Sequence, residues 1–281
     1  MTAGDVTTIV TNNSWKPALV CDGIDDYGEV NAATVALVAS NSTTGAIMAW
    51  VKPLSHAQTG CIFSSGNNGA AEYLHLSLEA GHIHTEMAIA GVQFDVTSTA
   101  AMDFSDNKWH HVAVVQNGTN PVLYFDGIAV AMTNNTATQL SAWYDELTGG
   151  DHGAIGVLDM NGTQTLDWDG GISGVKIYNE IALSADEVKA EYESGDARNA
   201  PNLIDSRKLD LAAAVHNHWV CDDLTDDGSG ADNMTLTGNA VNHLFYSDLT
   251  QKMNNAYTHA NDIVNVIHDN GSYVVTIVHG A

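Results

Sequence analysis

Hydrophobic residues between positions 19 and 178 come in short stretches, which Gly, Asn and Asp interrupt at roughly ten-residue intervals. This rhythm is typical of an antiparallel sandwich rather than of alternating βαβ units. The clearest strand is predicted at residues 109–116, where Asn117 and Gly118 provide a turn to a second strand at residues 122–127. The pattern therefore predicts an all-β, antiparallel fold.

A second hairpin is predicted at residues 73–89, with Ala80 and Gly81 as its two-residue turn. Side chains alternate between the faces of a strand, so this turn decides which residues share a face. The histidines and glutamates of one face could bind zinc or respond to pH, because histidines two apart on a strand, such as His82 and His84, point the same way. The plainer alternative is a hydrated face. The apolar face carries Leu74, Leu76, Leu78, Ile83, Met87 and Ile89. The polar face carries His75, Ser77, Glu79, His82, His84 and Glu86.

Two segments follow a helical period instead. Ser184 and Glu187 form a capping box, which predicts a helix that begins after Leu183. Apolar residues at three- and four-residue steps predict an amphipathic helix over residues 247–268. We therefore interpret residues 1–246 as the sandwich and residues 247–281 as a helix-and-strand extension that docks or oligomerises. The predicted contact face of this extension is Leu249, Met253, Tyr257, Ile263 and Ile267.

Acidic residues outnumber basic ones by 34 to nine, which gives a formal net charge of −25. Such a charge repels phosphate backbones and anionic lipid headgroups, so nucleic-acid binding and membrane-surface binding are not expected. No apolar run approaches the roughly 18 residues of a membrane span. Residues 1–10 lack the basic start and apolar core of a secretory signal, so we expect a protein made without export.

Five segments, in this order, resemble the strand signatures and the short final helix of laminin-G-like domains of the concanavalin A-like sandwich class. The resemblance implies a jelly-roll of two antiparallel sheets. It also implies the functions that this class holds, which include sugar binding, adhesion, glycoside hydrolysis and polysaccharide lysis. The segments are residues 22–30, 45–53, 109–118, 123–127 and 170–192.

The order of the segments departs from that family at one place. Residues 218–240 look like strands that commonly open such a domain, yet here they follow the sandwich. We favour a rotated order in which residues 216–241 complete the same sandwich, because a lone half-domain would expose unpaired strand edges. A truncated second copy and an unrelated appendage are the alternatives. On the favoured interpretation, Trp50, Trp109 and Trp219 are buried between the two sheets.

Catalytic motifs are missing from the sequence. Sandwich glycosidases place alternating acids on one strand, of the form Glu-x-Asp-x-(x)-Glu, so that two carboxylates face a cleft. No such run exists here, and Glu191 and Glu193 lie at the end of the predicted helix. No nucleophile elbow, phosphate-binding loop or His-Glu-x-x-His motif is present either. We therefore expect a protein that is not an enzyme, with a lyase or glycosidase as the weaker alternative.

Calcium is the expected ion, because it prefers carboxylate and carbonyl oxygens from loops. Laminin-G-like relatives often hold calcium at a loop rim, which implies a role for the aspartates of the 22–30 signature. The loop at residues 222–232 partly resembles an EF-hand loop but has Met234 at its twelfth position. A hydrated acidic loop is the alternative. The predicted calcium ligands are Asp22, Asp25, Asp26, Asp223 and Asp227.

A glycan site needs flat aromatic faces beside hydrogen-bonding groups. Trp143, Tyr144, Asp145 and His152 lie together in a segment with loop-like composition, and we predict that they form an exposed recognition surface. The alternative is that Trp143 folds over the edge of the sandwich.

The expected function is a non-catalytic structural or adhesion protein. A compact adhesion-type sandwich without a signal or anchor fits a virion component, such as a phage capsid decoration, fibre or tail-associated protein. Its partners would be other virion proteins or a second copy, through the C-terminal helix, and a cell-surface glycan. A free-standing carbohydrate-binding, lectin-like module is the alternative.

Overall fold

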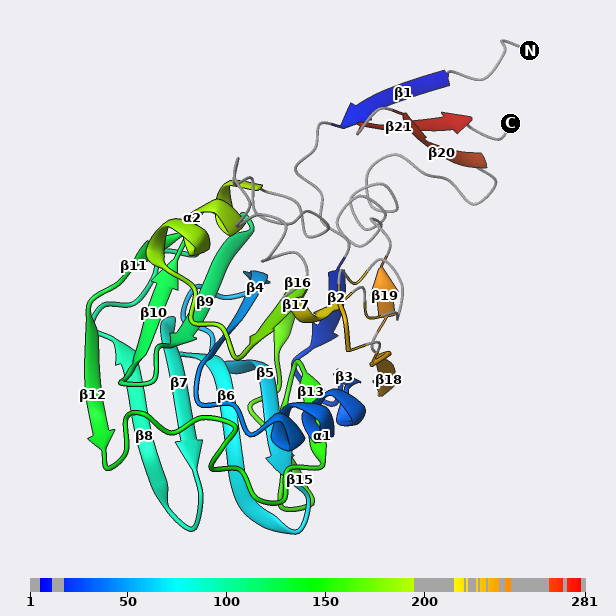
Figure 1. Ribbon diagram of the computed structural model, residues 1–281. Coiled ribbons are helices and arrows are strands. Elements are labelled where there is room, and N and C mark those ends of the chain that lie inside the picture. Colours follow the sequence, from blue (N-terminus) through cyan, green and yellow to red (C-terminus); the bar gives the residue numbers. More distant parts are fainter. Residues whose placement is uncertain are drawn as a thin grey trace.

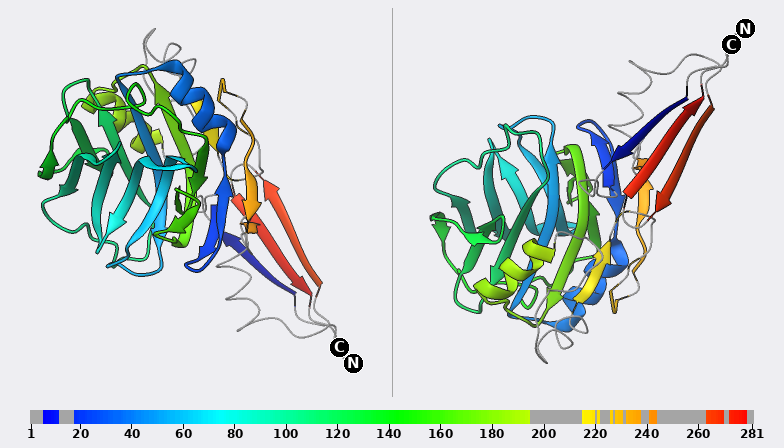
Figure 2. Two further views of the ribbon diagram at one scale, coloured as in Figure 1. Left: turned by 90° about the horizontal axis from the view of Figure 1, so that it is seen from below. Right: turned by 90° about the horizontal axis from the view of Figure 1, so that it is seen from above.

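The computed structural model describes residues 6–11, 18–194, 215–219, 221, 226, 228–230, 232–237, 241–243, 263–269 and 272–278. Two eight-stranded sheets face each other as the layers of a sandwich, and all of their strand pairs are antiparallel (Figures 1 and 2). This arrangement confirms the predicted all-β jelly-roll sandwich.

One sheet, called the β4 sheet below, has the order β11-β10-β9-β4-β16-β2-β19, with β17 also paired to β16. Its central strands are almost wholly buried, because one face covers the core and part of the other lies under a helix. Its strands are β2 (Ala18–Asp22), β4 (Gly45–Pro53), β9 (His110–Gln116), β10 (Pro121–Phe125), β11 (Ile128–Ala129), β16 (Asp169–Asn179), β17 (Val215–Trp219) and β19 (Val241–His243).

The other sheet, called the β6 sheet, has the order β12-β8-β7-β6-β5-β13-β3-β18. A two-stranded ribbon of β14 (Leu158–Met160) and β15 (Thr163–Thr165) contacts β5 and β6. The strands of the β6 sheet are β3 (Tyr27–Glu29), β5 (Gly60–Asn67), β6 (Ala70–Glu79), β7 (His82–Ala88), β8 (Val92–Ser98), β12 (Met132–Ala137), β13 (His152–Ile155) and β18 (Thr235–Thr237).

The core between the sheets is built from alternating positions of the strands. Leu74, Leu76 and Leu78 of β6 point into it, as do Ile83 and Met87 of β7, as the predicted hairpin requires. The tryptophans of this core are Trp143, Trp168 and Trp219.

The prediction for the other two tryptophans was wrong. Trp50 lies on the opposite face of β4 from Ile47, Ala49 and Val51 of the core, where its ring stacks on that of Tyr192 with 5.6 Å between centroids. Trp109 precedes β9 and is half-buried.

Helix α2 (Ala185–Ser194) covers the outer face of the β4 sheet and starts at the predicted capping box. The Ser184 N–H donates to Glu187 Oε2 at 2.7 Å, and the Glu187 N–H donates to Ser184 Oγ at 3.3 Å. Val188 then packs with Met48 and Tyr178 in a second small core.

Helix α1 (Asn31–Ser40) was not predicted. It lies between two strand signatures and buries Ala33, Thr34 and Leu37 while Val35 is exposed, so its apolar residues do not mark one helical face in the sequence. Asn41 ends it in the left-handed conformation.

The strands that follow α2 in the sequence pair with strands that precede it. β17 joins β16 next to β2, β19 joins β2, and β18 joins β3 at the edge of the β6 sheet. Trp219 is fully buried, and its ring stacks on that of Phe63, a residue of β5, at 6.3 Å between centroids. Strands β17, β18 and β19 therefore contribute to both sheets of the same sandwich.

The segments β1 (Val6–Thr11), β21 (Ser272–Val278) and β20 (Ile263–Asp269) form a separate three-stranded antiparallel sheet. This sheet extends away from the sandwich (Figures 1 and 2). The predicted helix over residues 247–268 was wrong from Ile263 onward, since β-branched residues at Ile263, Val264, Val266 and Ile267 favour a strand that pairs with β21. Its earlier part, with Leu249, Met253 and Tyr257, lies outside the described residues.

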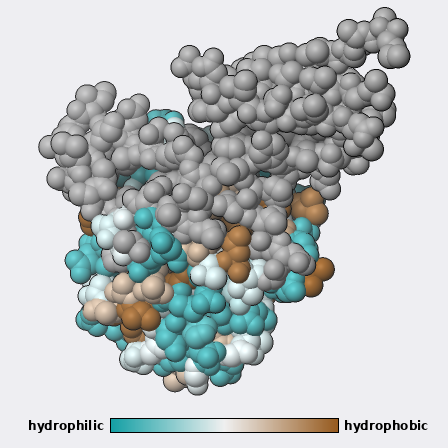
Figure 3. All heavy atoms as spheres, turned by 90° about the vertical axis from the view of Figure 1, so that its right-hand side faces the viewer, coloured by the Kyte–Doolittle hydropathy of each residue, from teal (hydrophilic) through white to brown (hydrophobic). Residues whose placement is uncertain are grey.

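The described surface beside β3 and β18 is largely hydrophilic, with hydrophobic residues in separate spots (Figure 3). Isolated apolar side chains of this kind are ordinary on a protein surface. None of the helices in the described ranges is long and apolar enough to cross a membrane.

Candidate functional site

The outer face of strands β6, β7 and β8 gathers polar and charged side chains. Strand register places Ser77 opposite His84, and His75 opposite Glu86, as the Ala80-Gly81 turn predicts. The next strand places Asp95 opposite Glu86. We call this surface, together with Tyr73 of β6 and Asn135 of β12, the polar face. It is the candidate ligand site of this protein.

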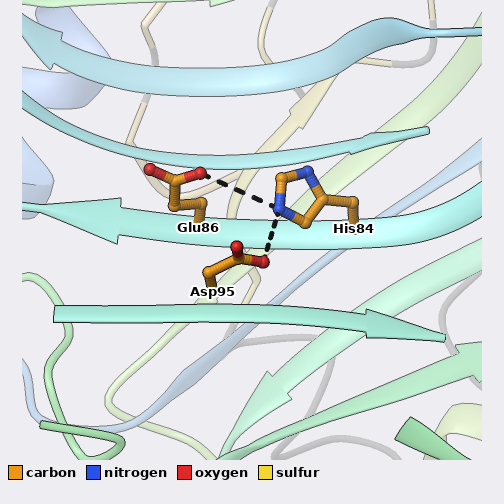
Figure 4. Close-up of side chains that lie close together, drawn as sticks. All are labelled: His84, Glu86 and Asp95. Carbon is orange, nitrogen blue, oxygen red and sulfur yellow. Dashed lines mark hydrogen bonds and ion pairs between the residues drawn. The ribbon is translucent and has the colours of Figure 1, made fainter. Parts of the chain in front are cut away.

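His84 lies at the centre of the polar face, with only 8% of its surface exposed. Its Nε2 atom is 3.0 Å from Asp95 Oδ1 and 3.9 Å from Glu86 Oε2, so both carboxylates approach the same nitrogen (Figure 4). On the other side of the ring, Nδ1 is 3.3 Å from Ser77 Oγ. The imidazole is therefore held from both sides.

Neighbouring side chains orient the two carboxylates. The Tyr73 hydroxyl donates to Glu86 Oε1 at 2.5 Å, and the Asn135 amide donates to Asp95 Oδ1 at 3.0 Å. Burial raises the pKa of Tyr73, and the adjacent Glu86 carboxylate raises it further, so the phenol stays protonated. These contacts position Glu86 and Asp95 before any ligand arrives.

His75 forms the floor of the polar face. Its surface is 2% exposed, and its ring stacks on that of Tyr73 at 5.7 Å and meets that of His84 edge-on at 5.2 Å. Burial, and then the neighbouring His84, lower the pKa of His75 to about 3, so this ring is neutral at physiological pH. The alternative prediction of a hydrated face is therefore wrong for His75 and His84, because side chains on neighbouring strands pack closely against both rings.

A second cluster of acids follows β2. Ligand oxygens of Asp22, Asp25 and Asp26 all lie within 4.8 Å of one another, and the Asp22 N–H donates to Asp26 Oδ2 at 3.2 Å. Burial raises the pKa of Asp167 and Asp169, and the nearby negative charges raise both further. We call these five aspartates the acidic rim. The other predicted calcium ligands, Asp223 and Asp227, lie outside the described residues.

The prediction of an exposed recognition surface at Trp143 and Tyr144 was wrong. Each is 1% exposed, and the Tyr144 hydroxyl hydrogen-bonds to Ser65 Oγ inside the sandwich. Asp145 Oδ1 accepts a bond from the Trp143 N–H, and His152 pairs with Asp151 at the start of β13. The segment is loop-like, but its aromatic side chains are part of the core between the sheets.

Glu191 and Glu193 do not form a catalytic pair. Glu191 is buried against Lys176, with 2.7 Å between Oε2 and Nζ, whereas Glu193 is exposed on α2 and pairs with Lys189 at 3.5 Å. Residues two apart on a helix point to different sides of it, so the two carboxylates lie in different surroundings.

Comparison with known proteins places the fold. Residues 22–189 match the family model described as the concanavalin A-like lectin/glucanases superfamily. No curated protein matches the chain. Among solved structures, the CBM40 of the Ruminococcus gnavus IT-sialidase, bound to α2,3-sialyllactose, has a TM-score of 0.51 and 17% identity, over 64% of this chain and 99% of that one.

The same CBM40 bound to α2,6-sialyllactose gives a TM-score of 0.51 and 17% identity, over 65% of this chain and 97% of that one. A heptameric SAP-like pentraxin from Limulus polyphemus gives a TM-score of 0.43 and 17% identity, over 86% of this chain and 98% of that one.

Proposed function

Because the chain belongs to the concanavalin A-like lectin/glucanases superfamily, we propose that it is a non-catalytic carbohydrate-binding module whose glycan lies on the polar face. The observation that carries this proposal is the set of pre-positioned hydrogen-bonding groups on β6, β7 and β8. Sugar hydroxyls donate to carboxylates and accept from amides, and Glu86, Asp95 and Asn135 offer both. Tyr73, stacked on His75, adds an aromatic surface beside them.

The charges on the polar face favour a neutral glycan. None of the eight strands of the β6 sheet contains Lys or Arg, while Glu86 of β7 lies directly opposite Asp95 of β8. The R. gnavus CBM40 is bound to sialyllactose, but a sialic acid carboxylate on this chain would meet two carboxylates and no basic side chain of the sheet. The ligand class that fits is therefore an uncharged oligosaccharide.

Two arrangements of acids support a binding role over catalysis. Glu191 is engaged by Lys176, and both Glu86 and Asp95 are directed toward His84. A retaining glycosidase needs two carboxylates about 5–5.5 Å apart on either side of a sugar bond, one free to attack it. Release of reducing ends from a neutral polysaccharide would contradict the non-catalytic proposal.

A glycan array tests the binding site. The wild-type chain should retain neutral oligosaccharides and not their sialylated forms. Asp95→Asn and Glu86→Gln should each weaken retention about tenfold or more, since a hydrogen bond to a charged group contributes about 1.5–3 kcal/mol. Glu193→Gln makes the same chemical change on exposed α2, beside the other sheet, and should leave binding unchanged. Preference for sialylated glycans, or undiminished binding by both polar-face variants, would contradict the proposal.

We also propose that the acidic rim holds calcium. Asp22, Asp25 and Asp26 supply oxygen ligands only, at separations that suit the 2.3–2.6 Å bonds of this ion. Burial, and then the nearby negative charges, raise the pKa of Asp167 and Asp169, and a cation there would relieve the repulsion between these carboxylates.

Calcium at about 100 times its Kd should stabilise the protein by about 2.7 kcal/mol, measured as a rise in Tm against a chelator control. Asp26→Asn should abolish the rise. Asp103→Asn, at an exposed acid of another loop, should preserve it. Equal melting curves in calcium and in chelator would rule the site out.

The proposed biological setting is a virion, in which the module would be carried by other virion proteins or by a second copy. What supports a partner is the β1-β21-β20 sheet, whose outer strands β1 and β20 each have one unpaired edge among the described strands. Such edges pair readily with another chain. A full chain that stays monomeric, both alone and when mixed with other virion proteins, would contradict this role.

A further inference from the structure

Two carboxylates converge on one nitrogen of His84, an arrangement that a proton alone does not explain. The Nε2 atom carries at most one hydrogen, and Asp95 Oδ1 at 3.0 Å is within its reach. Glu86 Oε2, at 3.9 Å from the same nitrogen, is beyond hydrogen-bond distance. A cation between the three atoms would contact all of them, so the geometry is that of a chelating site.

His110 of the same protein shows a different arrangement, in which two carboxylates hydrogen-bond to a histidine. Its Nδ1 is 2.8 Å from Asp126 Oδ2 and its Nε2 is 3.0 Å from Asp106 Oδ1, so each nitrogen has its own carboxylate. Burial alone would lower the pKa of His110, but the hydrogen bonds to Asp126 and Asp106 outweigh it and the pKa is raised. That arrangement favours the protonated imidazole, and because its carboxylates bind different ring nitrogens, the three groups cannot chelate one ion.

Each of the three converging side chains is oriented through another contact. Ser77 Oγ can accept a hydrogen from Nδ1 of His84, which leaves the lone pair of Nε2 free for an ion. Tyr73 holds the remote oxygen of Glu86, and Asn135 holds Asp95. Metal ligands in proteins commonly have such partners, because the partners fix the direction of the lone pairs.

The donor set and its spacing suit a divalent transition metal. One imidazole and two carboxylates are the ligand types that zinc accepts, with bonds of about 2.0–2.2 Å. Tetrahedral ligands at that distance lie about 3.3 Å apart. The observed separations of 3.0 and 3.9 Å bracket this value, and all three ligand atoms lie within 4.8 Å of one another. Small side-chain rotations would bring the three ligand atoms to the spacing that zinc requires.

We propose that His84, Glu86 and Asp95 form a binding site for a divalent transition metal ion, of which Zn²⁺ fits best. The side chains are 10%, 18% and 26% exposed, so the ion would be reached from the outer face. Three protein ligands leave a fourth position for water or for a ligand hydroxyl. The site lies within the proposed glycan surface but does not depend on glycan binding.

Calorimetric titration of the tag-free, chelator-stripped full chain with ZnCl₂ tests this site, in calcium so that the acidic rim does not contribute. One zinc ion should bind per chain. His84→Gln and Glu86→Gln should each weaken binding about 100-fold or abolish it. Tyr73→Phe, which removes only the orienting hydroxyl of Glu86, should weaken it about tenfold. His110→Gln is the matched control and should bind zinc as the wild type does.

Nitrogen-15 NMR provides an independent readout of the same site. Zinc should shift the Nε2 resonance of His84 in a nitrogen-15 spectrum and leave His110 unaffected, which reports on the site even if a variant folds poorly. No binding, or binding that survives both His84→Gln and Glu86→Gln, would overturn the site. Glycan binding by zinc-free protein would leave the proposed function standing, and zinc binding without any glycan affinity would leave the metal site standing.

Discussion

Replacing Glu191 by leucine should lower the free energy of unfolding by about 3–5 kcal/mol. Glu191 is 2% exposed and Lys176 is 4% exposed, and the pair ties α2 to the central strand β16. Tyr178 donates a short hydrogen bond to the other oxygen of the same carboxylate. The leucine would remove the carboxylate that the buried Lys176 ammonium contacts at 2.7 Å, and deleting one partner of a buried ion pair is strongly destabilising.

Urea unfolding of three variants checks this result. Glu193→Leu changes an exposed pair on the same helix and should cost less than about 1 kcal/mol. The double variant Lys176→Leu/Glu191→Leu should recover much of the loss, because it removes both charges. A loss for Glu191→Leu no larger than that for Glu193→Leu would show that α2 does not dock on β16 as described.

Truncating Trp219 to alanine should cost about 3–5 kcal/mol, as for other fully buried tryptophans. The indole is completely buried, stacks on Phe63 of the facing sheet, and donates its Nε1–H to the Asp232 carbonyl at 2.9 Å. Removal therefore opens a cavity between the sheets and takes the donor away from a partly buried acceptor.

The control for Trp219→Ala is Leu54→Ala, which truncates a side chain that is 77% exposed. That change should stay within about 0.5 kcal/mol of the wild type in chemical denaturation. Equal midpoints for the two variants would mean that residues 215–219 do not contribute to the core. That result would contradict a sandwich to which β17, β18 and β19 belong.

Much of the fold is predictable because side-chain alternation leaves few choices. The 73–89 hairpin shows this, since a two-residue turn sets its register and one slip would turn Leu74 and Leu76 to the outside. The helix at Ser184 is predictable for a similar reason, because its capping box marks the first turn.

The predictions that failed concern residues whose pattern fits two structures. Ile263 and Ile267 suit one face of a helix, but the β-branched residues between them suit a strand, and pairing with β21 decides the outcome. Trp143 lies in a segment with loop composition, and composition does not show whether a loop side chain points outward or into the core.

The site was only partly predictable from the sequence. His84 and Glu86 are on the predicted polar face, but Asp95 and Asn135 come from neighbouring strands. The register of β7 with β8 shifts between Met87 and Ala88, and that of β12 with β8 shifts beside Asn135. Bulges of this kind change which residues face each other, so spacing along the chain does not bring Asp95 to His84.

A crystal structure of the protein with a neutral oligosaccharide that it retains on the array would locate the glycan site directly. We expect sugar density over β6, β7 and β8, with hydroxyls within hydrogen-bond distance of Glu86 and Asp95. Sugar bound at the acidic rim or on the β4 sheet, with the polar face empty at saturating ligand, would contradict this expectation.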